Sequence, residues 1–151
     1  MTDWTRRDLL KVAAATGCCG AMSGCKLPDP TPPRGQVDVG APDDYPKDGA
    51  YDRLAKTWGI IIIRKGQELL ALSAVCTHEK CIVQPVPEGF RCPCHNSGYN
   101  ETGGVVRGPS LRALDRFPIS LNSTGHVIVD STKPADDPAN PGEGFAVRLQ
   151  P

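Results

Sequence analysis

Six side chains that can bind metals lie within twenty residues near the middle of this 151-residue chain. They form two short motifs, Cys76-Thr-His-Glu-Lys-Cys81 and Cys92-Pro-Cys-His-Asn-Ser97. Each motif offers cysteine and histidine together, and each follows a segment that reads as a strand. Because strands that end in loops can direct ligands from two places in the chain toward one centre, the spacing predicts a metal centre between two loops.

Two kinds of centre use two cysteines and two histidines. Zinc accepts such a set, but its usual spacings pair cysteine with cysteine and histidine with histidine. A [2Fe–2S] cluster of the Rieske type binds two cysteines on one iron and two histidines on the other. One cysteine and one histidine from each loop would supply that arrangement. Iron–sulfur chemistry is therefore favoured, and a structural zinc module is the alternative.

The two motifs closely resemble those of Rieske iron–sulfur proteins. The similarity extends upstream to Leu70-Ala-Leu-Ser-Ala-Val75 and downstream to Arg107-Gly-Pro109, and it covers residues 37–130. It implies a [2Fe–2S] cofactor in a small all-β protein, an antiparallel β-sandwich or barrel with a cluster-binding subdomain of two loops. It also implies one-electron transfer, with no substrate chemistry of the chain's own.

The resemblance gives the motif residues individual roles. Cys76 and Cys92 match the ligands of one iron, and His78 and His95 match the ligands of the other. The segment Gly108-Pro109-Ser110 resembles the proline loop that covers the cluster, although the second proline of that loop is absent.

The same resemblance accounts for the surplus cysteines. Cys81 and Cys94 match the pair that forms a disulfide between the two loops in high-potential members of the family. Ser97 and Tyr99 match residues whose hydroxyls hydrogen-bond a bridging sulfide and a cysteine ligand. Such bonds stabilise the negative charge of the reduced state, so we expect a potential in the upper part of the Rieske range of about −150 to +300 mV.

The expected partner is another redox protein, namely a c-type cytochrome, a cytochrome b or a molybdoprotein subunit. The leading hypothesis is a tethered carrier or a subunit of a respiratory quinol- or cytochrome-linked complex. Glu79-Lys80 replaces the Leu-Gly that quinol-docking subunits usually carry, and charges enter an apolar quinol pocket at a cost. A polar tip therefore suits a soluble protein partner better. The second hypothesis is a small Rieske subunit in a molybdenum oxidoreductase resembling arsenite oxidase, and a dioxygenase ferredoxin is a third.

The elements that must position the motifs are predicted to be short strands. The apolar, β-branched run Trp58–Arg64, the turn at Lys65-Gly66 and the segment Glu68–Ser73 predict a hairpin. A helical turn is expected within Tyr45–Lys56. Further strands are predicted at Gln36–Gly40, Phe90–Cys92, Gly104–Val106, Phe117–Leu121, His126–Asp130 and Phe145–Leu149. His126 is expected to be a surface histidine.

Composition agrees with a loop-rich domain. There are 15 prolines and 16 glycines, which argues against a helical bundle. The 17 basic and 17 acidic residues balance, so no nucleic-acid partner is expected. No apolar run reaches the roughly 18 residues that cross a bilayer.

The first 25 residues look like an export signal. Arg6-Arg7 with the following Leu9, Leu10 and Lys11 resembles the twin-arginine (Tat) signal, and a short apolar run comes next. Met22-Ser-Gly-Cys25 resembles a lipobox, so Cys25 is the lipidation candidate, with Cys18 as a weaker second one. Conventional cleavage, or retention of the segment as an anchor, is the alternative.

The sequence therefore divides into three parts. Residues 1–25 are the signal, and the proline-rich residues 26–35 are expected to form an extended tether. Residues 36–151 form the Rieske domain, with the cluster-binding subdomain at about 74–112. The expected location is the periplasmic side of the cytoplasmic membrane, with Tat export and a lipid or signal anchor.

Overall fold

The computed structural model describes residues 31–150. The elements in chain order are β1 Gln36–Gly40, the 3-10 helix η1 Pro42–Asp44, β2 Gly49–Tyr51, α1 Ala55–Trp58, β3 Ile60–Lys65, β4 Glu68–Ser73, β5 Gln84–Val86, β6 Gly89–Arg91, β7 Gly98–Tyr99, β8 Val105–Arg107, β9 Arg116–Phe117, β10 Ile119–Leu121, β11 Val127–Asp130 and β12 Val147–Arg148. Every pairing between named strands is antiparallel, which confirms the predicted all-β class.

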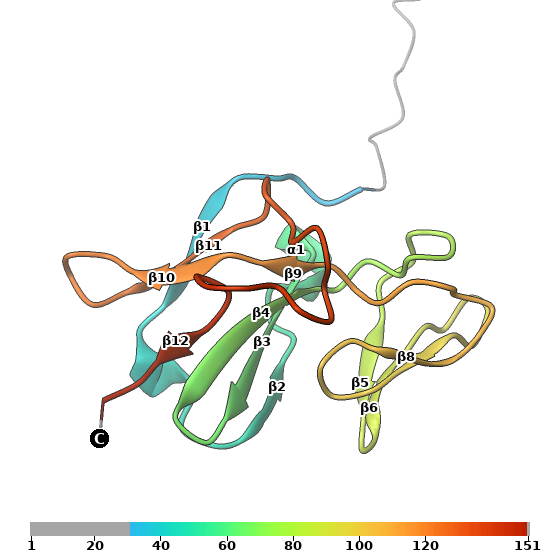
Figure 1. The fold of residues 1–151 in the computed structure, drawn as a ribbon, viewed down its shortest axis with the longest axis horizontal. Helices are drawn as coiled ribbons and strands as arrows, with labels where there is room; N and C mark the ends of the chain where they lie inside the picture. The colour runs from blue at the N-terminus through green and yellow to red at the C-terminus, as the bar shows by residue number, and fades with distance from the viewer. Residues whose placement is uncertain (1–30, 151) are drawn as a thin grey trace, which may run out of the picture.

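The strands form three sheets (Figure 1). One has the order β1-β11-β10, and the second has the order β12-β4-β3-β2 with β9 also paired to β4. The third, β5-β6-β7-β8, stands to one side of the other two in Figure 1. Neither helix in the described residues 31–150 has the length and apolarity needed to span a bilayer.

The hairpin β3–β4 is buried on both faces and joins two cores. Ile60 and Ile62 lie in the core shared with the β1-β11-β10 sheet. Ile61 and Ile63 point the opposite way, into a core that also contains Cys76. Because side chains alternate along a strand, an unbroken apolar run suits a strand that is covered on both sides. The four isoleucines therefore connect the core under the β1-β11-β10 sheet to the core that contains Cys76.

The predicted strand Trp58–Arg64 starts two residues too early. Trp58 ends helix α1, and Gly59 caps that helix in the left-handed conformation with φ 65°. A glycine cap suits this conformation because it has no Cβ, so the chain can turn directly into β3. The predicted helical turn falls only at the end of the range Tyr45–Lys56, whose middle forms β2 instead.

Other strand predictions differ at their ends. The range Phe117–Leu121 divides at Pro118, with β9 pairing to β4 and β10 pairing to β11. Proline has no N–H for a ladder, and here it lies where the chain changes sheets. Within Phe145–Leu149 only Val147–Arg148 pairs, along the edge of β4. The strands near the second motif shift by one residue to Gly89–Arg91 and Val105–Arg107.

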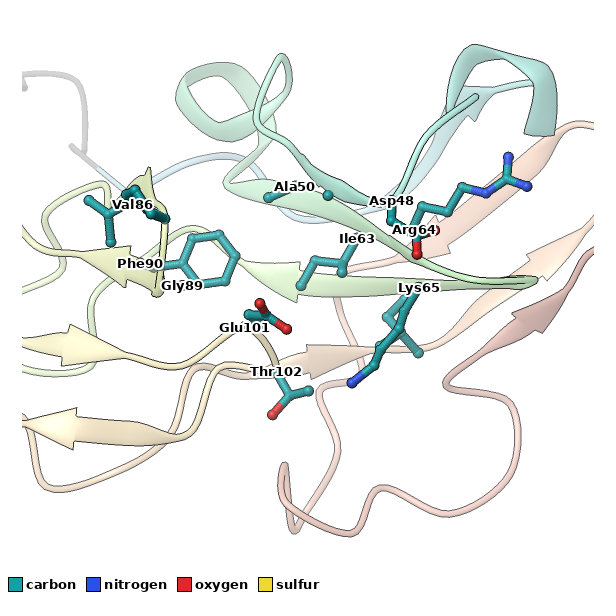
Figure 2. A pocket seen from close by; sticks show the side chains of 13 residues that line it. Asp48, Ala50, Ile63, Arg64, Lys65, Val86, Gly89, Phe90, Glu101 and Thr102 are labelled. Atoms are coloured by element: carbon teal, nitrogen blue, oxygen red, sulfur yellow. The ribbon is translucent and has the colours of Figure 1, made fainter.

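A glycine permits close contact between strands of the third sheet. Gly89 has φ 134°, and a Cβ there would collide with the backbone of Tyr99 and Asn100. Beside it, a cleft of about 350 Å³ separates this sheet from the β2–β3 hairpin, with Phe90 and Ile63 pointing toward each other in it (Figure 2).

Two carboxylates on the β1–β11 pair are stabilised as anions. A hydrogen bond from the Gly40 backbone N–H, followed by one from His126, lowers the pKa of Asp38. Hydrogen bonds from the hydroxyl and the backbone of Thr132 lower the pKa of Asp130. His126 is exposed, as predicted, and its Nδ1 lies 2.9 Å from a carboxylate oxygen of Asp38.

The export signal, including Arg6, Arg7 and the lipidation candidate Cys25, lies outside the described residues. The tether is described only from Thr31 onward. The third sheet lies within the predicted subdomain at about 74–112, whose boundaries stay a prediction, as do those of the other two parts.

Candidate metal centre

The first motif forms a tight loop between two backbone hydrogen bonds. The Cys76 N–H donates to the Cys81 carbonyl at 2.8 Å, and the Lys80 N–H donates back to the Cys76 carbonyl at 2.9 Å. Lys80 adopts φ 55°, a left-handed conformation that is uncommon outside glycine. The loop therefore turns back on itself directly after Cys76.

The second motif repeats the same backbone arrangement. The Cys92 N–H donates to the Ser97 carbonyl at 2.8 Å, and the Asn96 N–H donates to the Cys92 carbonyl at 3.0 Å. Asn96 adopts φ 62°, equivalent to Lys80 in the first loop. Each loop therefore begins with a cysteine held in the same way.

The four predicted ligands form two pairs of opposite exposure. Cys76 and Cys92 are each only 1% exposed, and they are the free cysteines among the described residues. His78 and His95 are exposed, and their ring centroids lie 4.9 Å apart. Thiolate and imidazole are suitable donors for iron in an iron–sulfur cluster. The site thus has a buried sulfur side and a solvent-facing nitrogen side.

A disulfide joins the two loops, as the resemblance implied. Cys81 and Cys94 are bonded across a sequence separation of 13 residues. The pairing leaves two thiols in the described part of the chain. The disulfide therefore removes Cys81 and Cys94 from the possible metal ligands and leaves Cys76 and Cys92 as the sulfur donors.

Hydroxyl groups surround the sulfur of Cys76. The buried Tyr99 hydroxyl lies 3.2 Å from Cys76 Sγ, and its effect on the potential stays a prediction. The sequence placed Ser110 in the expected cover loop but gave it no role, and its Oγ lies 3.6 Å from the same sulfur and 2.5 Å from the Tyr99 hydroxyl. Its position directly after Pro109 in the expected cover loop was the available signal.

Ser97 connects the cover loop to the second motif. Its side chain is fully buried, and its Oγ accepts the backbone N–H of Ser110 at 3.1 Å. Gly108 and Pro109 are themselves exposed. The loop thus presents Pro109 to solvent while Ser110 points inward.

The environment of the two thiols favours different protonation states in the iron-free protein. Burial raises the pKa of Cys76, but hydrogen bonds from Tyr99, the His78 backbone and Ser110 outweigh it, and the pKa is lowered to about 7. Burial raises the pKa of Cys92, and its neighbour Cys76 adds to the increase. Since the thiolate is the form that binds metal, Cys76 is prepared for ligation near neutral pH.

The charged pair between the first histidine and the disulfide lies in solvent. Glu79 reaches across to the second loop, with its carboxylate 3.6 Å from His95 Nδ1. Lys80 is exposed and makes no ion pair within residues 31–150. The sequence predicted the charges at this tip, but not the contact between the loops.

Known proteins resemble the part of the chain that builds this site. A cytochrome b6-f complex iron-sulfur subunit from Chlorobaculum thiosulfatiphilum is 35% identical over 71 residues, covering 46% of this chain and 39% of that protein. A putative respiratory nitrate reductase subunit Rieske from Haloferax mediterranei is 41% identical over 75 residues, covering 48% and 33%. The chain thus matches less than half the length of these relatives.

Among solved structures, the cyanobacterial plasma membrane Rieske protein PetC3 from Synechocystis PCC 6803 is 24% identical, with a TM-score of 0.48. The comparison covers 62% of this chain and 98% of that one.

The family profile described as Rieske [2Fe-2S] domain matches residues 35–118, which is more than half of the chain. The match includes both loops, the disulfide and Ser110, and it implies a [2Fe–2S] cofactor. The chain belongs to the Rieske [2Fe–2S] domain family.

Proposed function

We propose that this protein transfers single electrons through a cluster held by Cys76 and Cys92 on one iron and His78 and His95 on the other. The observation that carries the proposal is the placement of two buried free thiols and two neighbouring exposed imidazoles on matching loops that a disulfide joins. When bound, the [2Fe–2S] cluster accepts and releases one electron. The cysteine side of the site is shielded from solvent, while a redox partner can approach the exposed histidine side.

Iron and acid-labile sulfide analysis of the purified full chain tests this proposal, together with EPR spectroscopy after reduction. We expect equal amounts of iron and sulfide and a Rieske-type spectrum. His95→Gln should abolish that spectrum, whereas His126→Gln removes an exposed histidine elsewhere and should preserve it. Zinc in place of iron, or an unchanged spectrum in His95→Gln, would exclude the proposed ligand set.

We also propose that the protein works on the periplasmic side of the cytoplasmic membrane. The Arg6-Arg7 signal supports Tat export, and the Cys81–Cys94 disulfide suits an oxidising compartment. Residues 26–35 would then serve as the tether, with Cys25 as the lipid-bearing residue. Replacing both Arg6 and Arg7 with lysine should retain the protein in the cytoplasm. Cys25→Ala should release the exported protein from membranes, and unchanged membrane association would contradict lipidation.

For the partner we propose a redox protein that docks at the two histidines. One relative is named as a subunit of a cytochrome b6-f complex and another as a putative subunit of a respiratory nitrate reductase. These names support a cytochrome complex or a molybdoprotein-type reductase as candidates. The exposed Glu79 and Lys80 favour a polar protein surface over an apolar quinol pocket, because burial of an unpaired charge is costly.

The distribution of charge suggests an acidic surface on that partner. Lys80, Arg107 and Arg112 are exposed in segments that join or border the loops, and Glu79 and Asp115, the ion-pair partner of Arg112, offset part of this positive charge. The acidic Glu88 and Glu101 lie at the opposite turns of the third sheet. Complementary charge accelerates encounter at low salt. We expect anionic ferricyanide to oxidise the reduced protein faster at low salt, and cationic tris(phenanthroline)cobalt(III) to do so more slowly.

The matched variants for this test are Arg107→Gln and Lys47→Gln, where Lys47 is an exposed cation between η1 and β2. The first should weaken the salt dependence of the ferricyanide reaction, and the second should leave it nearly unchanged. Equal salt dependence in both variants would show that the cations beside the loops do not direct docking.

A further inference from the structure

The Ser110 hydroxyl is enclosed in the same space as the sulfur of Cys76. The residue is 3% exposed, and its Oγ lies 2.5 Å from the Tyr99 hydroxyl and 3.6 Å from Cys76 Sγ. Its backbone N–H donates to Ser97 at 3.1 Å, which fixes the residue on the second loop. Ser110 is therefore positioned to act on the sulfur without being a ligand.

A third hydroxyl nearby is already committed elsewhere. Thr77 Oγ1 donates its proton to the Arg112 carbonyl at 2.6 Å, so it has no proton left for the sulfur. The Thr77 backbone N–H points at the Tyr99 oxygen at 3.3 Å and helps to hold that side chain. The hydroxyl protons that can reach Cys76 are those of Tyr99 and Ser110.

The number of hydroxyl protons decides which of these two residues donates a hydrogen bond to the sulfur. Each carries one proton, and the 2.5 Å contact between their oxygens uses one of the two. A single proton therefore remains for Cys76 Sγ. The Tyr99 oxygen is closer to the sulfur, at 3.2 Å against 3.6 Å, so Tyr99 is the donor to Cys76 and Ser110 donates to Tyr99.

We propose that Tyr99 and Ser110 act as one unit that delivers a single hydrogen bond to the Cys76 sulfur. In the intact protein Ser110 is a positioning residue, because it orients and polarises the Tyr99 hydroxyl. When the Tyr99 hydroxyl is absent, Ser110 turns its proton to the sulfur and becomes the substitute donor. The inference rests on the proposed role of Cys76 as a ligand.

The unit predicts that the effect of Ser110→Ala depends on Tyr99. A hydrogen bond to the sulfur favours the reduced state, in which the sulfur carries more negative charge. With Tyr99 present, Ser110→Ala removes only the polarisation of the Tyr99 hydroxyl by Ser110. The equilibrium constant for reduction should fall about twofold, which lowers the midpoint potential by about 18 mV. In the Tyr99→Phe background, Ser110→Ala removes the remaining hydrogen-bond donor to the sulfur. The equilibrium constant for reduction should then fall about tenfold, which lowers the midpoint potential by about 59 mV.

The test is redox titration of the full chain and of Ser110→Ala, Tyr99→Phe and the double variant, followed by visible absorption and EPR. Ser131→Ala is the matched control, because it also deletes a buried serine hydroxyl, one that bonds Gly35 and not the thiol network. Its potential should equal that of the unaltered protein. The spectra report whether each variant holds its cluster, independently of the potential.

If Ser110→Ala shifted the midpoint potential equally with and without the Tyr99 hydroxyl, the two residues would not act as one unit. The absence of a shift in both proteins would overturn the inference as well. A protein that forms no Rieske-type cluster would overturn the proposed function and this inference together. An intact spectrum with equal shifts would overturn only the inference.

Discussion

The disulfide between the two loops should contribute a measurable share of the stability of the domain. Reduction, or replacement of both Cys81 and Cys94 by serine, opens a closed loop whose ends are 13 residues apart in sequence. The chain-entropy relation gives about 3 kcal/mol for a loop of this length, since the unfolded chain regains freedom that the crosslink had removed. For a domain of this size, that loss lowers the melting temperature by roughly 10 °C.

The measurement is urea and thermal unfolding of the iron-free protein, because a bound cluster would also connect the loops. Cys94 is exposed, so a phosphine reductant can reach the bond. Reduced wild-type protein and the double serine variant should then unfold together, and oxidised wild-type protein should unfold at higher urea. A difference below about 1 kcal/mol between oxidised and reduced protein would refute the entropic argument and place the stability of the loops in their backbone hydrogen bonds.

Three further outcomes follow from the structure. Ser97→Ala should lower the midpoint potential by about 60 mV, the equivalent of a hydrogen bond of about 1.4 kcal/mol to a charged acceptor. An unchanged midpoint potential in redox titration would contradict the expected hydrogen bond from Ser97 to a bridging sulfide. Gly89→Ala should cost roughly 3 kcal/mol in chemical unfolding, because its Cβ meets backbone at a positive φ, whereas Gly108→Ala in open space should cost little. Asp38 and Asp130 have lowered pKa values when folded, so their contribution is present above about pH 4 and is lost as the pH falls through the folded values. Replacing both with asparagine should therefore flatten the decline of stability below pH 4, and an acid limb as steep as that of the unaltered protein would contradict it.

Local patterns were sufficient to single out the candidate ligands. Cys76, His78, Cys92 and His95 lie in short motifs, and the structure gives two buried free thiols and two neighbouring exposed imidazoles at these positions. The role of Ser110 could not be predicted in the same way. Its place after Pro109 in the cover loop indicates that it lies near the cysteine motifs, but the 2.5 Å contact with Tyr99 comes from the fold and is encoded by no short-range spacing.

The fold was predictable where one residue pattern dominates and less so where tertiary contacts decide. The run of isoleucines predicts a strand at β3, but the residue at which β3 begins depends on the cap of helix α1 at Gly59. The short strand β5 contains Pro85, a residue that argues against a strand except at an edge. It forms there because β5 is an outer strand of its sheet, a position visible only after the sheet is assembled.

The double-faced burial of β3 and β4 bears on how fast electrons can move. The thiols of Cys76 and Cys92 belong to a core whose other wall is that hairpin, and the reverse face of the hairpin is packed against the β1-β11-β10 sheet. A close-packed interior resists displacement, so we expect the sulfur atoms to keep nearly the same positions in both oxidation states of a bound cluster. We therefore expect the β1-β11-β10 sheet to help keep the reorganisation energy of electron transfer low, although its core residues pack on the far face of the hairpin.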